Sequence, residues 1–409
     1  MSTKTRAEIF QQVKFDILAP THVQDNLNKA REIARTFISD TVTAPTPEMY
    51  AYASLASLGD DVYSEPSTIA LESHMAQLTG KEAALFMTSG TASNQIALRT
   101  HLKQPPYTVL WFCVTTARIS IITRLVEQLS TPGPPLLRSF RPTAIISRLK
   151  TWRPTSSVPQ IFTCRATRPA FTSLPNSLFS APTEVIALEN TLKGTIFPQE
   201  DIIAISKYAH SHGIKMHLDD ARIWHVAVET QTPIKALCDP FDTVSLCFSK
   251  GLGAPVGSCL VGPKEFIAKA RWFRKLFGGG MRQTGFLAAC AAYALTHNFP
   301  QLERVHALAK RLEAGLESIG VDITSRAETC MVFYDPTPIG VTYDEIAERG
   351  SALPEPLFLG GSRLVVHFQT SEAAVSDFLA VVGDLATEKK AAGFIKPTVY
   401  AKASGFKDV

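Results

Sequence analysis

The stretch DTVSLCFSKGLGAPVGSCLVG, residues 242–262, decides the fold. An apolar run ends at Ser249 and Lys250, a glycine-rich turn follows, and a second apolar run begins at Ser258. This pattern predicts a strand, a tight turn and a second strand. Lys250 can be an ordinary lysine on a β-turn. Alternatively, its amine can form a Schiff base with a cofactor that carries a carbonyl group.

Upstream of this stretch, strand and helix patterns alternate. EVIALEN (184–190) predicts a strand, PQEDIIAISKYAHSHG (198–213) predicts a helix, and IKMHLDD (214–220) predicts another strand. Such alternation is typical of βαβ units in a parallel sheet. Asp219 follows the apolar part of the second strand, at the sheet edge where open α/β folds bind ligands. Its carboxylate fits a helix cap equally well.

Nearer the N-terminus, AALFM (83–87) predicts a strand that runs directly into the helix pattern TSGTASNQIALRTHL. Gly90 permits a tight turn between them. Thr91 and Ser93 bring hydroxyls to the start of the helix, where free N–H groups attract an anion. The arrangement suits a phosphate group, and an ordinary capped helix explains it as well.

The remaining patterns complete an α/β chain. Residues 1–36 predict a polar helical extension, and 37–289 contain the strands and helices of a large domain. The helix TIALESHMAQLTG is expected to be capped by Ser67 or Thr68 and to stop at Gly80. Residues 290–409 predict a smaller α+β domain with helices over 301–320 and 371–390 and strands over 328–334 and 363–368.

Three of these features together match the needs of one cofactor, pyridoxal phosphate. It requires a lysine for the Schiff base, an acid beside the pyridine nitrogen and a cup for the phosphate. Lys250, Asp219 and the pair Gly90 and Thr91 supply these groups. Each signal alone is moderate, but the order of the three groups along the chain is consistent with one pyridoxal phosphate site.

At this point the sequence resembles the threonine aldolases, which are fold-type-I pyridoxal phosphate enzymes of the aspartate aminotransferase superfamily. The matching motifs are FISDTVTAPT, GDDVYSEPST, ALFMTSGTASNQ, ALENT, MHLDDAR, SLCFSKGLGAPVGS, RKLFGGGMRQTG and SRLVVHF. They cover residues 37–110 and 182 to about 385. The resemblance implies an α/β fold with a large, mostly parallel domain and a small C-terminal domain.

The resemblance also implies a role for individual residues. Lys250 and Asp219 would be catalytic. Gly90, Thr91 and Arg222 would join them in binding the cofactor. Ser39, Arg222 and Arg363 would bind the substrate carboxylate, for which a guanidinium fork is well shaped.

Members of the family assemble as dimers or tetramers with sites at subunit interfaces. The motif RKLFGGGMRQTG, with Arg274, Lys275 and Arg282, is therefore expected to contribute across an interface.

Three positions depart from the family motifs. Ile38 stands where the family usually has Arg, and Asp220 and Ser64 stand where it usually has Gly. Asp220 matters most, because it adds a carboxylate beside Asp219 and replaces a residue that is free to take a positive φ.

Residues 111–181 differ from the rest of the chain. They contain nine basic residues, one acid, eight of the 26 prolines, one glycine and no histidine. A disordered insertion is one explanation. A frame shift is another. The family peptide CDHRAHIYNYEAGGA, read one nucleotide out of phase, can give Val114 to Gln128, and a second shifted stretch covers Ile146 to Pro154. We expect the correct frame to resume near Pro182. The family's histidines for stacking on the cofactor and for the substrate hydroxyl would be lost with this segment.

Composition excludes several classes of protein. With 409 residues and 45% hydrophobic residues, the chain can bury a large core, and no stretch reads as a signal peptide or a membrane span. Seven cysteines without a C-x-x-C pair indicate reduced thiols in the cytosol and no metal site. Residues 111–181 carry a net charge of +8 and the rest of the chain carries −4, so neither nucleic acid nor a membrane is expected as a partner.

The expected reaction is cleavage of a small β-hydroxy amino acid, L-threonine or L-allo-threonine, to glycine and acetaldehyde by a homodimer or homotetramer. The altered segment raises the prospect of impaired activity. Two alternatives stay open: an alanine racemase on the same scaffold, and a catalytically inactive paralogue that joins a mixed oligomer.

Overall fold

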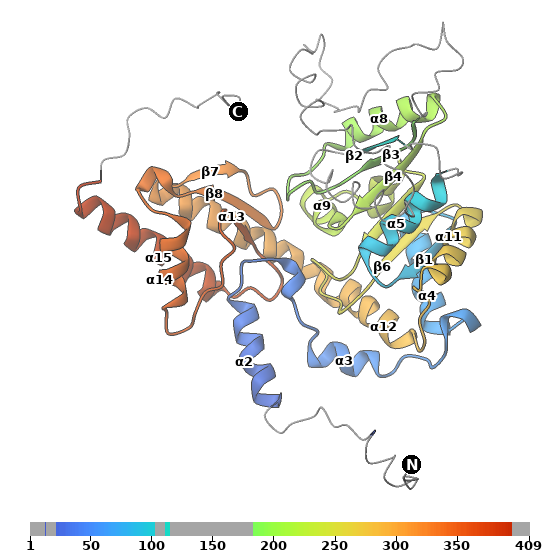
Figure 1. Cartoon of the computed structure of the whole chain (residues 1–409), viewed down its shortest axis with the longest axis horizontal. Helices are drawn as coiled ribbons and strands as arrows, with labels where there is room; N and C mark the ends of the chain where they lie inside the picture. The colour runs from blue at the N-terminus through green and yellow to red at the C-terminus, as the bar shows by residue number, and fades with distance from the viewer. Residues whose placement is uncertain (1–12, 14–21, 103–110, 115–182, 395–409) are drawn as a thin grey trace, which may run out of the picture.

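The computed structural model describes residues 13, 22–102, 111–114 and 183–394. Figure 1 shows two lobes: one holds a six-stranded sheet, and the other holds a three-stranded sheet with the C-terminal helices. Residues 115–181 lie outside the described ranges, so the frame-shift hypothesis stays a prediction. None of the helices in the described ranges is long and apolar enough to cross a membrane.

The large sheet has the strand order β1-β6-β5-β4-β3-β2. The strands are β1 (Ala83–Met87), β2 (Trp111–Val114), β3 (Thr183–Leu188), β4 (Lys215–Asp220), β5 (Thr243–Cys247) and β6 (Ser258–Gly262). Strands β2 to β5 are parallel, and β6 runs antiparallel to both β1 and β5. The prediction of a mostly parallel α/β sheet is therefore confirmed. The start of the altered segment forms β2, at one edge of this sheet.

Strand direction and register bring three chain segments to the same edge of the sheet. Because β1 and β5 both run antiparallel to β6, they run parallel to each other. Met87 at the end of β1 and Cys247 at the end of β5 both pair with Ser258. Asp219, on β4, pairs with Ser245 on β5. The residues after β1, β4 and β5 therefore lie close together in space.

Helices flank this sheet and connect its strands. They are α3 (Pro47–Ala53), α4 (Pro66–Thr79), α5 (Gly90–His101), α8 (Gln199–Ser211), α9 (Ile223–Thr230), α10 (Ile234–Cys238), α11 (Lys264–Leu276) and α12 (Gly285–Tyr293). Gly80 ends α4 in the left-handed conformation, as predicted. The predicted cap of α4 is wrong. Its N-cap is Glu65, whose carboxylate accepts hydrogen bonds from the backbone N–H groups of Ser67 and Thr68.

The C-terminal lobe contains β7 (Asp322–Ser325), β8 (Met331–Asp335) and β9 (Arg363–Val365) with α13 (Leu302–Ile319), α14 (Tyr343–Ser351) and α15 (Glu372–Ala391). The predicted domain boundary at residue 290 falls inside α12. Helix α2 (His22–Ala34) leads into a segment that crosses to this lobe. There the N–H of Phe37 donates to the carbonyl of Phe358, and the N–H of Val365 donates to the carbonyl of Phe37.

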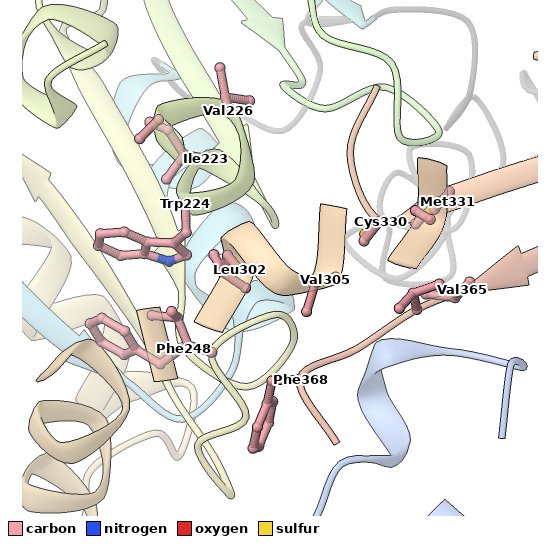
Figure 2. Packing of buried hydrophobic residues seen from close by; sticks show 14 of the residues in the cluster. Ile223, Trp224, Val226, Phe248, Leu302, Val305, Cys330, Met331, Val365 and Phe368 are labelled. Atoms are coloured by element: carbon pink, nitrogen blue, oxygen red, sulfur yellow. The ribbon is translucent and has the colours of Figure 1, made fainter. Parts of the chain in front are cut away.

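One hydrophobic cluster joins the two lobes. Figure 2 shows Trp224 of α9 beside Phe248, with Leu302 and Val305 of α13 close by and Phe368 below them. The Trp224 indole N–H also donates to the carbonyl of Cys247, the last residue of β5, at 2.8 Å. The packing therefore fixes α9 against the end of the strand that precedes Lys250.

We predict that Gly253 is required for this packing. Gly253 has φ +69°, and a Cβ added there would lie 2.2 Å from Phe368 Cε1. Gly253→Ala should destabilise the protein by roughly 2–5 kcal/mol, since backbone strain and overpacking add. Gly213 has the same φ but nothing within 4 Å of an added Cβ, so it isolates the backbone contribution. Gly213→Ala should cost only about 1 kcal/mol.

Thermal unfolding of the two variants measures the difference. Equal losses of melting temperature would contradict a specific clash with Phe368.

Candidate active site

Lys250 occupies a turn that several hydrogen bonds hold in place. The N–H of Gly253 donates to the Lys250 carbonyl at 2.9 Å, and the N–H of Ala254 donates to the Phe248 carbonyl at 3.0 Å. The Asn298 amide donates to the carbonyl of Leu252 at 2.7 Å. The Lys250 ammonium makes no hydrogen bond or ion pair with any residue in the described ranges. The backbone of the turn is thus held in place, while the Lys250 amine has no partner among the described residues.

Asp219 lies at the end of β4, where the sequence predicted it. Asn94, on the first turns of α5, donates from Nδ2 to Asp219 Oδ2 at 2.8 Å. Sequence reasoning missed Asn94, although it lies in the motif TSGTASNQ, because asparagine within a helix pattern carries no signal of its own. The hydrogen bond fixes the orientation of the Asp219 carboxylate.

The N-terminus of α5 starts at Gly90, at the same edge of the sheet. Ser89 is its N-cap, and the Ser89 hydroxyl accepts from the N–H of Ala92 at 3.1 Å. Thr91 is exposed. The predicted role of Ser93 is wrong, because this side chain is fully buried and hydrogen-bonds to Ser245 on β5 at 2.7 Å. Gly90 and Thr91 are therefore the residues of this helix start that can meet an anion.

Arg222 is held by a carboxylate of the N-terminal segment. Its Nε and Nη2 donate to Asp40 Oδ2 and Oδ1 at 2.8 and 2.7 Å. The Asp40 side chain is 0% exposed and that of Arg222 is 15% exposed. Burial acts to raise the pKa of Asp40, but the Arg222 guanidinium outweighs it, and the pKa lies below its usual value. Sequence reasoning missed Asp40, although it follows Ser39 directly.

Ser39 and Arg363 lie beside this pair. The Ser39 hydroxyl accepts from the N–H of Thr41 at 3.2 Å and caps a short helical turn (Asp40–Val42). Arg363 is exposed at the start of β9, and its Nη2 donates to the carbonyl of Ile38 at 3.3 Å. The structure thus brings Ser39, Arg222 and Arg363 together around residues 38–40. Asp40 already accepts two hydrogen bonds from the Arg222 guanidinium, whereas no carboxylate in the described ranges pairs with Arg363.

Two of the departures from the family motifs occupy contrasting environments. Asp220 is buried, and its Oδ1 accepts from the Arg222 N–H at 2.8 Å. Burial, aided by the charge of Asp219, raises the pKa of Asp220 well above its usual value, so we expect a neutral acid that adds no charge. Asp220 has no positive φ. Ser64, by contrast, has φ +66°, the conformation that favours the family's glycine.

Arg274, which was expected at a subunit interface, makes its contacts within its own chain. It is 3% exposed, its Nη1 donates to the Phe86 carbonyl at 2.6 Å, and its Nη2 pairs with Asp61 at 2.6 Å. That part of the expectation is wrong, because this guanidinium is buried within its own chain and two of its nitrogens already have acceptors there. Lys275 and Arg282 lie on the surface, where Arg282 pairs with Asp60.

Asp40, His225 and Cys330 form a buried cluster behind these residues. One oxygen of Asp40, one ring nitrogen of His225 and the sulfur of Cys330 all lie within 4.8 Å of one another. Such groups can bind a metal ion, but both Asp40 oxygens already accept hydrogen bonds from Arg222. The guanidinium charge also opposes a second cation at that position.

Comparisons with known proteins show the family to which the chain belongs. Residues 36–337 match the family model of the beta-eliminating lyases. The chain is 41% identical over 340 residues to the probable low-specificity L-threonine aldolase of Schizosaccharomyces pombe, covering 83% of this chain and 84% of the relative. It is 37% identical over 335 residues to the low specificity L-threonine aldolase of Saccharomyces cerevisiae, covering 81% of each.

A solved structure, the threonine aldolase of Leishmania major, has the same fold. It aligns with a TM-score of 0.63 at 19% sequence identity and covers 86% of this chain and 99% of that one. The architecture is therefore that of a fold-type-I enzyme. With this fold and these relatives, the chain belongs to the beta-eliminating lyase family and, within it, to the threonine aldolases.

Proposed function

We propose that this chain is a pyridoxal phosphate-dependent lyase that cleaves L-threonine or L-allo-threonine to glycine and acetaldehyde. The observation that carries the proposal is the convergence of three groups at one edge of the large sheet. These are Lys250 on its turn, Asp219 at the end of β4, and the N-terminus of α5 at Gly90.

The residues at this edge fit the cofactor. The amine of Lys250 is uncommitted among the described residues, and Asn94 already orients Asp219. Lys250 would hold the cofactor covalently, Asp219 would keep a proton on its ring nitrogen, and the N–H groups at Gly90 and Thr91 would bind its phosphate. Once bound, pyridoxal phosphate would supply an electron sink for the charge left on Cα when the Cα–Cβ bond breaks.

The substrate carboxylate would bind at residues 38–40. Arg363 is exposed there, and Ser39 offers a hydroxyl. Arg222 would act mainly by fixing Asp40 and the segment that carries Ser39, because Asp40 takes both of its inward N–H donors. This division of labour supports Arg363 as the group that recognises the carboxylate.

Retro-aldol cleavage also needs an acceptor for the proton of the β-hydroxyl group. The sequence has no histidine between His101 and His210. The histidines that the family carries in the region corresponding to residues 111–181 are therefore missing from this chain. We propose that its turnover is slower than that of its aldolase relatives. The relatives reported above are named aldolases, which favours this activity over the racemase and the inactive paralogue.

We further propose a homodimer or homotetramer. Large apolar side chains are exposed on and around α3, α4 and α12, where an open groove is also present. They include Tyr50, Tyr52, Leu55, Leu58, Val62, Tyr63, Ile69 and Phe286. A monomer seldom exposes so many neighbouring apolar groups, so a second copy of the chain is the expected cover. The cytosolic location stays a prediction.

Lys250→Ala should abolish both activity and covalent capture of the cofactor. Borohydride reduction followed by peptide mass spectrometry should find pyridoxal phosphate on Lys250 in the wild type and on no lysine in the variant. Aldehyde release from L-threonine should fall to background. Lys235→Ala, which removes an exposed lysine paired with Asp239, is the matched control and should behave as the wild type. Full aldolase activity in Lys250→Ala would refute the proposed function.

Arg363→Gln should raise the KM for L-threonine by at least about tenfold, since hydrogen bonds to a charged group contribute roughly 1.5–3 kcal/mol. Steady-state kinetics measure the change. Arg349→Gln removes an arginine that is exposed and pairs with Glu388, so it serves as the control and should leave KM unchanged. An unchanged KM in Arg363→Gln would mean that another residue binds the substrate carboxylate.

Replacing Leu55 and Leu58 together by Glu should dissociate the oligomer. Their side chains are 83% and 88% exposed, so the change should not disturb the fold of the monomer. Light scattering coupled to size-exclusion chromatography should report a multiple of 44.6 kDa for the wild type and one chain mass for the variant. Tyr208→Glu, on α8, replaces an exposed side chain elsewhere and should keep the wild-type mass. A variant that keeps its oligomeric mass would place the interface on another face.

A further inference from the structure

A ladder of ionisable side chains connects the buried side of the Lys250 turn to the surface. His225 and Glu229 lie one turn apart on α9, and His306 and Lys310 lie one turn apart on α13. His225 Nδ1 and His306 Nε2 are 2.9 Å apart, and His306 Nδ1 and Glu229 Oε2 are also 2.9 Å apart. Lys310 pairs with the other oxygen of Glu229. The ladder thus runs from a fully buried imidazole to an exposed ion pair.

The hydrogen bonds of the ladder specify where each proton lies. An ionised carboxylate only accepts, so His306 must donate its Nδ1 proton to Glu229. In a neutral His306 the other nitrogen, Nε2, is then an acceptor, and His225 must donate to it from Nδ1. Nε2 of His225 is left without a proton. Glu229 therefore selects the tautomer of His225, although these two side chains are not hydrogen-bonded to each other.

Both rings are expected to be neutral. His225 is 1% exposed and His306 is 3% exposed. Burial, supported by the neighbouring His306, lowers the pKa of His225 to about 3. Burial also lowers the pKa of His306, although the charge of Glu229 opposes this.

The unprotonated Nε2 of His225 lies directly under the Lys250 turn. A Cβ added to Gly251 would lie 2.3 Å from this nitrogen, so the ring packs against the backbone of the residue that follows Lys250. Nε2 has no hydrogen-bond partner within the described part of the chain. A buried acceptor without a partner costs about 1–3 kcal/mol, so a ring kept only for packing would be better replaced by an apolar one.

The charged and titratable groups around His225 belong to four elements. Asp40 is the first residue of the short helical turn in the N-terminal segment, Arg222 precedes α9, Cys330 precedes β8, and His306 comes from α13. The charge of Lys250 also acts on Asp40. The tautomer of His225 therefore determines whether a lone pair or an N–H dipole faces the backbone of the Lys250 turn.

We propose that His225 is a positioning residue for the Lys250 turn and the Asp40–Arg222 pair, held by His306 and Glu229 in the single tautomer that presents an unprotonated Nε2. This proposal rests on the proposed function, because it assigns Lys250 as the lysine that holds the cofactor. The lone pair favours a positive charge on the Lys250 nitrogen. An N–H in its place would disfavour that charge.

Nitrogen NMR of the full chain labelled with ¹⁵N-histidine tests the tautomer, with and without pyridoxal phosphate. The signals of His225 are assigned by their loss in His225→Phe. We expect one unprotonated Nε2 in the wild type. Glu229→Gln keeps the size of the side chain but can donate to His306, so it should introduce the opposite tautomer. Lys310→Gln removes the neighbouring charge and leaves the acceptor in place, so it should keep the wild-type tautomer.

A protonated Nε2 in the wild type, or an unchanged tautomer in Glu229→Gln, would overturn the proposal. If Glu229→Gln fails to fold, His306→Phe replaces it, since it keeps a stacked ring and removes the acceptor for His225.

The pH midpoint of the visible absorption band of the bound cofactor tests the positioning role. Glu229→Gln should lower the midpoint, because an N–H then faces the lysine turn and a negative charge is lost. Lys310→Gln changes the same ion pair by one charge of the opposite sign. If only long-range charge acts, the midpoints of Glu229→Gln and Lys310→Gln shift by equal amounts in opposite directions, and that result would overturn the positioning role. If the tautomer changes, the midpoint of Glu229→Gln shifts by the larger amount.

Failure of this inference and failure of the proposed function are distinguishable. The NMR result does not depend on turnover, whereas the proposed function is tested by cofactor capture on Lys250 and by aldehyde release, and it fails if Lys250→Ala remains active.

Discussion

The buried pair of Asp40 and Arg222 holds together the three parts of the chain that build the site. Two opposite charges out of water are tolerated only when they meet in good geometry, and breaking such a pair typically costs about 3–5 kcal/mol. Asp40 belongs to the N-terminal segment, and Arg222 belongs to the start of α9. The same segment is hydrogen-bonded to the C-terminal lobe through Phe37. Because of this pair, Ser39 and the carbonyl that Arg363 contacts lie beside the end of the large sheet.

The large sheet supplies the second constraint. Parallel strands end at one edge, so residues far apart in the sequence converge there without any contact that the sequence could reveal. Two glycines, which have no side chain, then let the backbone of the Lys250 turn pack closely against its neighbours. Gly251 packs against the His225 ring, and Gly253 packs against Phe368. The lysine thus sits on a turn that His225 of α9, Asn298 and Phe368 contact, while its own amine has no hydrogen bond or ion pair with the described residues.

The errors in the sequence-based predictions have a common physical origin. Ser67, Thr68 and Ser93 were assigned roles from their hydroxyls, but competing partners decide what a hydroxyl does. Glu65 caps the helix instead and accepts from the N–H groups of Ser67 and Thr68, and Ser245 hydrogen-bonds to the hydroxyl of Ser93. Arg274 was assigned to an interface from its charge, whereas Asp61 and the Phe86 carbonyl bury it. For Ser93 and Arg274 the deciding partner lies on another element of the fold, whereas Glu65 directly precedes the helix that it caps.

The sequence alone determined the fold class and the three main chemical groups, because strand and helix periodicity, glycine turns and a lysine after an apolar strand are local patterns. The family motifs added Arg363 as a predicted carboxylate-binding residue. Only the tertiary structure revealed Asn94 behind Asp219, Asp40 on Arg222, and the ladder from His225 to Glu229. These roles depend on the partner that a polar side chain meets once it is buried, and that partner is set by the packing of whole elements.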